Sequence, residues 1–260
     1  MTYPFVISIP HCASLVPEGI RADMALSDEE IRDSKDFGSA EIFRCLPAKK
    51  VLRAEYSRLV TDLNRDSKNP GPKGVVAETD YRGRQIYLPG RYPDADAVEK
   101  RIRQYYDPYH HELSRALANS EIRGLFDCHS LNGTGPVDAP DAGKKRKNII
   151  LSNNGAPDGG PDSRLGEPTC TAETVKLVKS ALESAGFSVA VNAPYQGGFI
   201  TVHYGRRLAA RGGFALQIEM NQDLYMPPGT AEPDPEQLED VGKRIFSAFE
   251  TIAKEVLMHS

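Results

Sequence analysis

The sequence predicts an α/β fold: one domain over residues 1–260, built on a mostly parallel, mixed sheet flanked by helices. Apolar runs of strand length alternate with amphipathic helical stretches, an order typical of a sheet covered on both faces. A chain of 260 residues is long enough to bury a full core as one domain. The sequence contains no internal repeat and no low-complexity tract that would indicate another architecture.

The first elements are a strand, a helix and two short strands. Residues 3–9 form an apolar run that ends at a proline. A helix is expected over residues 27–45, because Ser27-Asp28-Glu29-Glu30 has the Ser-x-x-Glu form of a capping box. Short β-like runs follow at residues 50–54 and 58–63.

A long loop and a long helix come next. Residues 66–93 are rich in Pro, Gly and Lys, a composition that favours a loop. Residues 94–119 carry apolar side chains at helical spacing. Pro108 lies inside this stretch and is expected to kink or split the helix.

The second half continues the alternation. Strands are expected at residues 124–128 and 148–152, with a polar loop between them and a Gly/Pro/Asp-rich loop after the second. A helix over residues 171–185 should end at Gly186, a helix-stop signal. The remaining elements are a strand at 187–191, a segment at 198–204 without an assigned type, a strand at 214–219 and a helix at 234–257.

The bulk composition excludes some classes of function. A formal charge of −4 and a pI near 5.9 argue against binding to nucleic acid or to a membrane surface, which usually requires a basic face. The one basic run, residues 144–147, is expected to be a solvated loop. The longest apolar stretch is too short to span a bilayer. The four scattered cysteines and the lack of a signal sequence predict reduced thiols and a cytoplasmic location.

Polar side chains stand where the predicted strands end. His11 follows the first strand, Asp127 and His129 end the strand "GLFDCHS", and Glu219 ends "FALQIEMN". In parallel α/β sheets, ligands bind beyond the carboxyl ends of the strands. Two histidines and a carboxylate can hold a zinc ion with one position open for water. A separate glutamate can act as general base, and an arginine can stabilise an oxyanion.

At these positions the chain resembles the N-formylglutamate amidohydrolase family. "DLNR" and "DCHS" are also similar to segments of the wider zinc carboxypeptidase and aspartoacylase group, which shares the fold. The matching pieces run in the family's order over more than 200 residues. They are "SIPHCASLVPEG" at 8–19, "DFGS" at 36–39, "SRLVTDLNRDS" at 57–67, "YYDPYHHEL" at 105–113, "FDCHS" at 126–130, "GGFITVHYG" at 197–205 and "ALQIEMNQDLYM" at 215–226.

The resemblance implies a zinc carboxypeptidase-like fold and a zinc hydrolase that cleaves the amide bond of an N-acyl amino acid. The expected substrate is N-formylglutamate, a small carboxylate whose hydrolysis to formate and glutamate is a late step of histidine breakdown. One zinc ion per chain is implied, with His11 and His129 at the first and last ligand positions.

The second ligand is less direct. A carboxypeptidase-like His-x-x-Glu pattern would place a glutamate at position 14, where this chain has Ser14. The "DFGS" piece instead suggests that Asp36 supplies the carboxylate, with Glu18 and Asp33 as alternatives.

The remaining roles also follow from the resemblance. Glu219 matches the general base, and Asn64 with Arg65 matches the pair that grips the α-carboxylate of the substrate. Arg58 is expected to polarise the scissile carbonyl or to hold a second carboxylate. A further group is expected to line the acyl or side-chain pocket or to assist there: Gly198, His203, Tyr204 and Arg206.

Several alternatives stay open on the sequence. The substrate could be another N-acyl amino acid or a small peptide, since one scaffold serves many acyl groups. Because Ser14 stands where the carboxypeptidase-like pattern has a glutamate, a second alternative is a catalytically silent protein that binds a small ligand without metal. Cys12 and Cys128 are interpreted as small packing residues rather than as nucleophiles or thiolate ligands. The loops 66–93 and 130–168 are long enough to act as lids.

Overall fold

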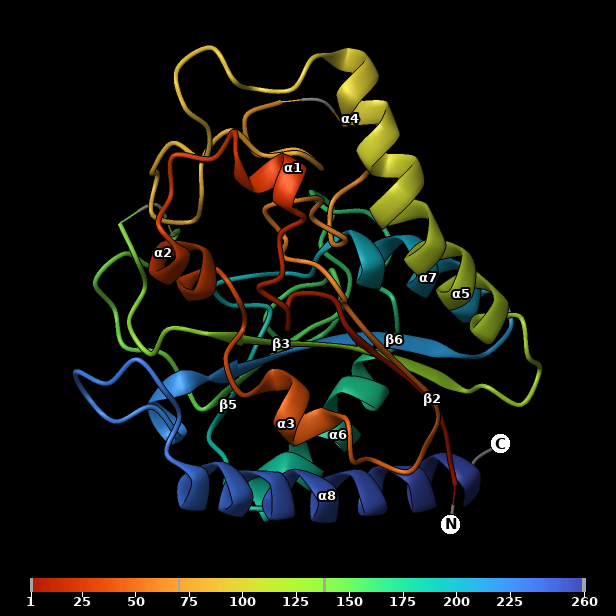
Figure 1. Ribbon diagram of the computed structural model, residues 1–260. Coiled ribbons are helices and arrows are strands. Elements are labelled where there is room, and N and C mark those ends of the chain that lie inside the picture. Colours follow the sequence, from red (N-terminus) through yellow and green to blue (C-terminus); the bar gives the residue numbers. More distant parts are fainter. Residues whose placement is uncertain (1, 70, 138, 259–260) are drawn as a thin grey trace.

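A six-stranded mixed sheet forms the centre of the computed structural model, which describes residues 2–69, 71–137 and 139–258 (Figure 1). The strand order is β2-β1-β3-β6-β4-β5. The first four of these strands are parallel to one another, whereas β4 runs antiparallel to β6 and parallel to β5. The strands are β1 Tyr3–Ile9, β2 Ala48–Arg53, β3 Gly124–Leu131, β4 Ile149–Ser152, β5 Val189–Val191 and β6 Phe214–Asn221. The predicted α/β class and mostly parallel sheet are therefore confirmed.

Helices cover both faces of the sheet. In Figure 1, α8 runs along one side beneath α3 and α6, while α5 and α7 lie on the other side. The α-helices are α1 Glu18–Arg21, α2 Asp28–Asp33, α3 Ser39–Phe43, α4 Ala95–Arg101, α5 Asp107–Leu117, α6 Ala172–Ser184, α7 Phe199–Ala209 and α8 Pro235–Met258. A π-helical segment, η1 Ile102–Tyr106, joins α4 to α5, and a 3₁₀ turn, η2 Gln222–Leu224, follows β6. The segment at 198–204 enters α7.

Alternation along the central strands divides the interior into two cores, because successive side chains of a strand point to opposite faces. Phe5, Phe126 and Leu216 belong to the core under α3, α6 and α8. Val6 and Leu125 belong to the second core, which α5 and α7 cover. Nearly every position of β1, β3 and β6 is buried, as expected for central strands of a sheet covered on both sides.

The second face becomes polar toward the carboxyl ends of the strands. Ser8 pairs in register with Asp127, which in turn pairs with Gln217. His129 pairs with Glu219 two residues further along β3 and β6. These five side chains share one face of the sheet because they alternate with the apolar positions of the other face. These five side chains form a polar surface at the centre of the sheet, the polar floor.

The helix expected over residues 27–45 is interrupted, and this corrects the sequence prediction. The capping box at Ser27 is present and starts α2, but α2 ends at Asp33 and α3 begins only at Ser39. Gly38 adopts φ +75°, a left-handed conformation that a helix interior does not contain. A Cβ at Gly38 would lie 2.5 Å from the ring of Tyr225. The break places Asp36 between two short helices.

Residues 58–63 do not form the expected strand. The segment is held by turns, in which the backbone N–H of Val60 donates to Ser57. Asp62 Oδ1 accepts from the backbone N–H of Asn64 at 2.9 Å. Such local side-chain bonds offer the backbone an alternative to a β ladder. The segment therefore crosses the carboxyl ends of the strands instead of joining the sheet.

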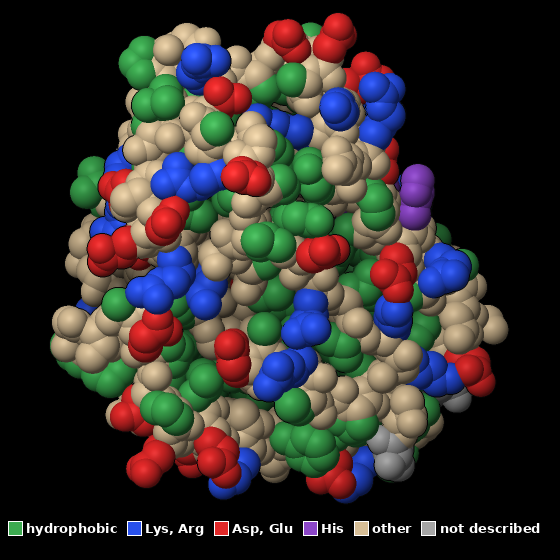
Figure 2. Space-filling view, in the orientation of Figure 1, with side chains coloured by type: hydrophobic (Ala, Val, Ile, Leu, Met, Phe, Trp, Pro, Cys, Tyr) green, Lys and Arg blue, Asp and Glu red, His purple; other side chains and the backbone are tan. Residues whose placement is uncertain are grey.

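Two further features concern the distribution of surface charge and the hydrophobicity of the helices. Lysine and arginine side chains are interspersed with aspartate and glutamate over the face seen in Figure 2, without a continuous patch of one charge. Among the helices of the described residues, none is long and apolar enough to cross a membrane.

Candidate active site

A cavity of about 390 Å³ opens above the polar end of the sheet. Its walls come from the turn at residues 58–65, the α2–α3 break, the loop at 73–81, the loop after β3 and the turn before α7. His11, His129 and Glu219 all lie in its lining. Segments that are distant in sequence therefore meet at the edge where the sheet topology predicts a ligand.

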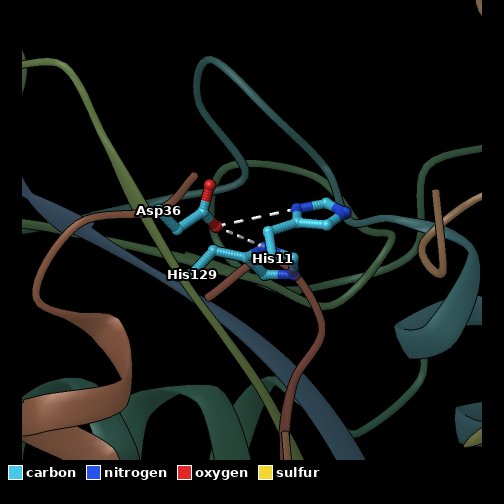
Figure 3. A group of neighbouring side chains, drawn as sticks. All are labelled: His11, Asp36 and His129. Atoms are coloured by element: carbon cyan, nitrogen blue, oxygen red, sulfur yellow. Dashed lines mark hydrogen bonds and ion pairs between the residues drawn. The ribbon is translucent and has the colours of Figure 1, made fainter. Parts of the chain in front are cut away.

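Three buried side chains converge in this cavity: His11, Asp36 and His129 (Figure 3). One potential ligand atom from each lies within 4.8 Å of the others. Asp36 Oδ2 lies 2.9 Å from Nδ1 of His129 and 3.6 Å from Nδ1 of His11. Both histidines thus present the same ring nitrogen to one carboxylate oxygen.

Each member of this group is fixed by a different element. His11 follows β1 after Pro10, and His129 is part of β3. Asp36 lies in the break between α2 and α3, where its backbone N–H donates to the carbonyl oxygen of His11 at 2.8 Å. The backbone N–H of Ser130 donates to Asp36 Oδ2 at 3.3 Å. These bonds attach the α2–α3 break to the ends of β1 and β3.

A second carboxylate stands behind each imidazole. His11 Nε2 lies 2.7 Å from Asp62 Oδ1, and His129 Nε2 lies 3.2 Å from Asp127 Oδ1. Asp127 is buried and also accepts from the hydroxyl groups of Ser8 and Thr201. A carboxylate on the outer ring nitrogen keeps the proton there and leaves Nδ1 free to bind a metal ion.

The donor set fits a divalent metal ion. Two imidazole nitrogens and one carboxylate oxygen are the ligands of many three-residue zinc sites. Asp36 is the carboxylate that lies with the two histidines. Of the two alternatives from the sequence, Glu18 is exposed on α1, and Asp33 pairs with Arg82 and Arg84.

The local electrostatics also favour a cation. Burial alone would raise the pKa of Asp36, but its hydrogen bonds with His11 and His129 outweigh burial and hold the pKa below the usual range. Burial would lower the pKa of His129, yet Asp127 and Asp36 raise it well above its ordinary value. The cluster of carboxylates therefore draws positive charge to the point where the imidazoles meet.

Glu219 is the remaining carboxylate of the polar floor. It stands beside His129 on the neighbouring strand and is half-buried. Burial raises the pKa of Glu219 to about 8; His129 acts against this rise, while Asp36 and Asp127 add to it. A carboxylate that binds a proton near neutral pH can both accept and return one during a reaction.

Of the three arginines that line the cavity, Arg58 and Arg65 belong to the turn at residues 58–65. Arg58 Nη2 donates to Asp62 Oδ2 at 2.7 Å, and Arg58 Nη1 lies 3.9 Å from Asp36. Arg65 donates to the backbone carbonyl oxygens of Asn64 and Lys73, and no ion pair is found for it within the described ranges. Arg58 thus forms an ion pair within the site, whereas the hydrogen bonds of Arg65 go to neutral carbonyl groups.

Asn64 is a connector beneath the cavity. Its Nδ2 lies 3.2 Å from Asp127 Oδ2 and 3.1 Å from His129 Nε2. Its Oδ1 accepts from the backbone N–H of Ile200 at 2.8 Å. A Cβ on Gly198 would lie 2.2 Å from Asn64 Nδ2, so this close approach requires a glycine there.

Three residues that the sequence analysis expects near the substrate do not line the cavity. His203 stacks on Phe199, with 4.8 Å between ring centroids. Tyr204 is buried and its hydroxyl group contacts His110 Nδ1 at 2.9 Å. Arg206 is exposed on α7. Gly197 and Gly198, just before α7, line the cavity, whereas these three residues lie within the helix.

Two residues of the site received no role from the sequence: Asp62 and Gln217. Asp62 lies in the matching piece at 57–67, but its contact with His11 depends on a turn where the sequence predicts a strand. Gln217 alternates with Glu219 on β6, which was the one signal that could have marked it. The cysteine interpretation agrees with the structure: Cys128 points into the apolar core, and burial raises the pKa of Cys12 to about 11.

Comparison with known proteins identifies relatives over most of the chain. The family described as N-formylglutamate amidohydrolase matches residues 3–226. A protein named N-formylglutamate deformylase from Pseudomonas aeruginosa is 27% identical over 237 residues, which cover 86% of this chain and 82% of the relative. A protein of the same name from Pseudomonas putida is 27% identical over 235 residues, with the same two coverages.

Solved structures show the same fold. The crystal structure of N-formylglutamate amidohydrolase from Ralstonia eutropha superposes with a TM-score of 0.78 at 23% identity, and covers 100% of this chain and 96% of that one. A gene product from Agrobacterium tumefaciens superposes with a TM-score of 0.65 at 19% identity, and covers 99% of this chain and 91% of that one.

Proposed function

Because the chain belongs to the N-formylglutamate amidohydrolase family, we propose that it hydrolyses N-formylglutamate to formate and glutamate at the cavity above β1, β3 and β6. The observation that carries this proposal is the convergence of His11, Asp36 and His129, with Glu219 beside them in register. This family is also the one that the sequence motifs resemble.

The metal proposed for this site is zinc, held by His11, Asp36 and His129. When bound, zinc supplies a Lewis acid and lowers the pKa of a water molecule at the site. Asp62 and Asp127 orient the two imidazoles for this purpose through their outer nitrogens.

Glu219 is proposed to move the proton. It takes a proton from the water molecule whose oxygen attacks the formyl carbon. When the carbon–nitrogen bond breaks, the electron pair stays on the nitrogen, and Glu219 returns the proton to it. The raised pKa of about 8 supports both transfers, because a general acid–base group works best when its pKa lies near the working pH.

Two arginines are proposed to act on the substrate. Arg58 lies between Asp36 and Asp62, where its guanidinium group can stabilise the negative charge that develops on the carbonyl oxygen. Arg65 offers its charge to the substrate carboxylate, which it can bind through two parallel hydrogen bonds. Asn64 supports Arg65 through the adjacent backbone and takes part mainly by holding Asp127, the carboxylate that faces His129.

The wider setting of the protein belongs to the same proposal. We propose that residues 1–260 form one catalytic domain that acts on a small carboxylate in the cytoplasm. The four cysteines are all free, which fits a reducing compartment.

The proposal is tested with zinc-loaded protein and a panel of formyl-, acetyl- and succinyl-amino acids. The expected result is about one zinc ion per chain and rapid release of formate from N-formylglutamate. Faster hydrolysis of an amino acid with another acyl group would identify that compound, instead of N-formylglutamate, as the substrate. Protein that binds no zinc and hydrolyses none of the panel would contradict the proposed function.

A further inference from the structure

Gln217 links the proposed general base to the first turn of α7. It lies on β6 two residues before Glu219, so both side chains point to the same face of the sheet. Gln217 is only 4% exposed. Its Nε2 donates to Glu219 Oε1 at 3.0 Å, and its Oε1 accepts from the backbone N–H of Gly198 at 2.6 Å. The amide therefore bridges the base and the turn that lines the cavity.

The orientation of this amide is fixed by the backbone. A backbone N–H can only donate, so the side-chain atom that faces Gly198 must be the oxygen of Gln217. The NH₂ group must then face Glu219, and the reverse orientation would set two donors against each other. Gln217 consequently donates to the carboxylate of Glu219.

This donation distinguishes the two oxygens of Glu219. Oε1 already accepts a hydrogen bond, which leaves Oε2 to take a proton from water. The bond also restrains rotation of a carboxylate that is only half-buried. Gln217 thus holds one oxygen of the base in place.

The same contacts continue to a proposed metal ligand. Gly198 precedes α7 as its N-cap, and Ile200 in the first turn of α7 donates its backbone N–H to Asn64 Oδ1 at 2.8 Å. Asn64 Nδ2 donates to Asp127 Oδ2 at 3.2 Å, and Asp127 Oδ1 lies 3.2 Å from Nε2 of His129. The first turn of α7 is therefore fastened at one point to the base and at another, through Asn64 and Asp127, to His129.

We propose that Gln217 is a positioning residue for the hydrolysis: it orients Glu219 and fixes the distance between the base and His129 through the first turn of α7. The inference rests on the proposed function, because it assigns Gln217 a role through the base of that reaction. It adds a residue that acts through Glu219 rather than as a metal ligand.

The test compares kcat and KM of Gln217→Met with those of the wild-type protein on the N-acyl amino acid that the wild type hydrolyses fastest. Methionine has a similar length but cannot make either hydrogen bond. The expected result is a kcat about 10- to 100-fold lower, because misplacement of a catalytic group costs about this much. KM, zinc content and the thermal unfolding midpoint should stay close to the wild-type values. Gln196→Met, an exposed glutamine in the preceding loop, is the matched control.

A double-mutant cycle separates positioning from a general structural role. If Gln217 acts through Glu219, adding Gln217→Met to Glu219→Gln should not lower the residual rate further. Should Gln217→Met fail to fold, Gln217→Glu replaces it, since an ionised carboxylate can still accept from Gly198 but cannot donate to Glu219.

The outcomes distinguish this inference from the proposed function. A wild-type protein that hydrolyses no member of the substrate panel contradicts the function and the inference together. An active wild type with an unchanged kcat in Gln217→Met overturns the positioning role alone. An equal loss of rate in the wild-type and Glu219→Gln backgrounds also overturns it.

Discussion

The imidazole rings of His11 and His129 lie 4.8 Å apart between centroids, and both direct Nδ1 toward the same oxygen of Asp36. Their outer nitrogens face separate carboxylates, so neither ring needs to turn in order to present a lone pair. This paired arrangement separates the ligand atoms from the groups that orient them. The first two predictions use that separation.

Asp36 should be required for metal binding. Asp36→Asn keeps the shape of the side chain but removes the negative charge that the metal needs. Zinc content measured after dialysis should fall well below one ion per chain. Asp33→Asn is the control, because Asp33 is a nearby carboxylate bound to Arg82 and Arg84, and this variant should keep its zinc. Full zinc occupancy in Asp36→Asn would remove Asp36 from the ligand set.

Asp62 should raise the affinity of the site for zinc without being a ligand itself. Asp62→Asn weakens the hold on the outer nitrogen of His11. Loss of such an outer partner typically lowers metal affinity by about 10- to 100-fold. Competition against a zinc chelator measures this change, with Asp66→Asn as the control from the same segment. An affinity equal to that of the wild type would show that His11 orients itself without Asp62.

Glu219 should be required for turnover but not for metal. Glu219→Gln cannot accept a proton, and general acid–base catalysis contributes about 10²- to 10⁴-fold. We expect kcat to fall by that factor, while zinc content stays near one ion per chain. Normal turnover in this variant would mean that another group is the base.

Arg65 should be required for binding of the substrate carboxylate. Arg65→Met removes the charge-assisted hydrogen bonds, each of which contributes about 1.5–3 kcal/mol, so KM should rise by about 10- to 100-fold with a smaller change in kcat. Arg65→Lys keeps the charge without the planar fork and should give an intermediate KM. The same KM for all three proteins would place the carboxylate elsewhere.

His110 should make folding stability depend on pH. Burial lowers the pKa of His110 to about 4 from an ordinary value of 6.5, although its bond to the Leu63 carbonyl acts in the opposite direction. The unfolded chain therefore binds a proton at this residue between pH 6.5 and about 4, whereas the folded protein does not. The stabilisation is complete above pH 6.5 and decreases as the pH falls toward 4, by about 3 kcal/mol in total.

Denaturant unfolding at several pH values measures this dependence. His110→Gln can still donate to Leu63 but does not titrate, so its stability should change less over the same range of pH. His111→Gln is the matched control at the exposed neighbouring position and should keep the wild-type slope. Identical slopes for the wild type and His110→Gln would contradict the linkage.

The sequence located His11, His129 and Glu219 because each follows or ends an apolar run, and parallel strands bring their carboxyl ends to one edge. Asp36 came from a family motif, since a residue between two helices has no periodicity that marks it. The helix break around Gly38 was missed because it depends on contact with Tyr225, far along the chain.

The supporting contacts could not be predicted from local pattern. Asp62 meets His11 only because residues 58–63 form turns rather than a strand. Gln217 acquires its partners from the strand register and from the position of α7. His203 and Tyr204 belong to a matching motif and Arg206 follows it, but all three lie within α7, beyond the Gly197-Gly198 turn that lines the cavity, and no sequence rule shows where a helix leaves a site.

The order of strands also determines where this protein can tolerate change. His11, His129 and Glu219 are supplied by β1, β3 and β6, which are consecutive in the sheet, whereas β2 and β5 form its two margins. Grafted peptides or reporter tags placed before β2 or before β5 would leave the spacing of His11, His129 and Glu219 untouched, whereas the connections after these two strands carry Arg58 and Gly198 into the cavity lining. The same changes between β3 and β6 would pull the reactive groups apart. The molecule is therefore most open to redesign at its two outer strands.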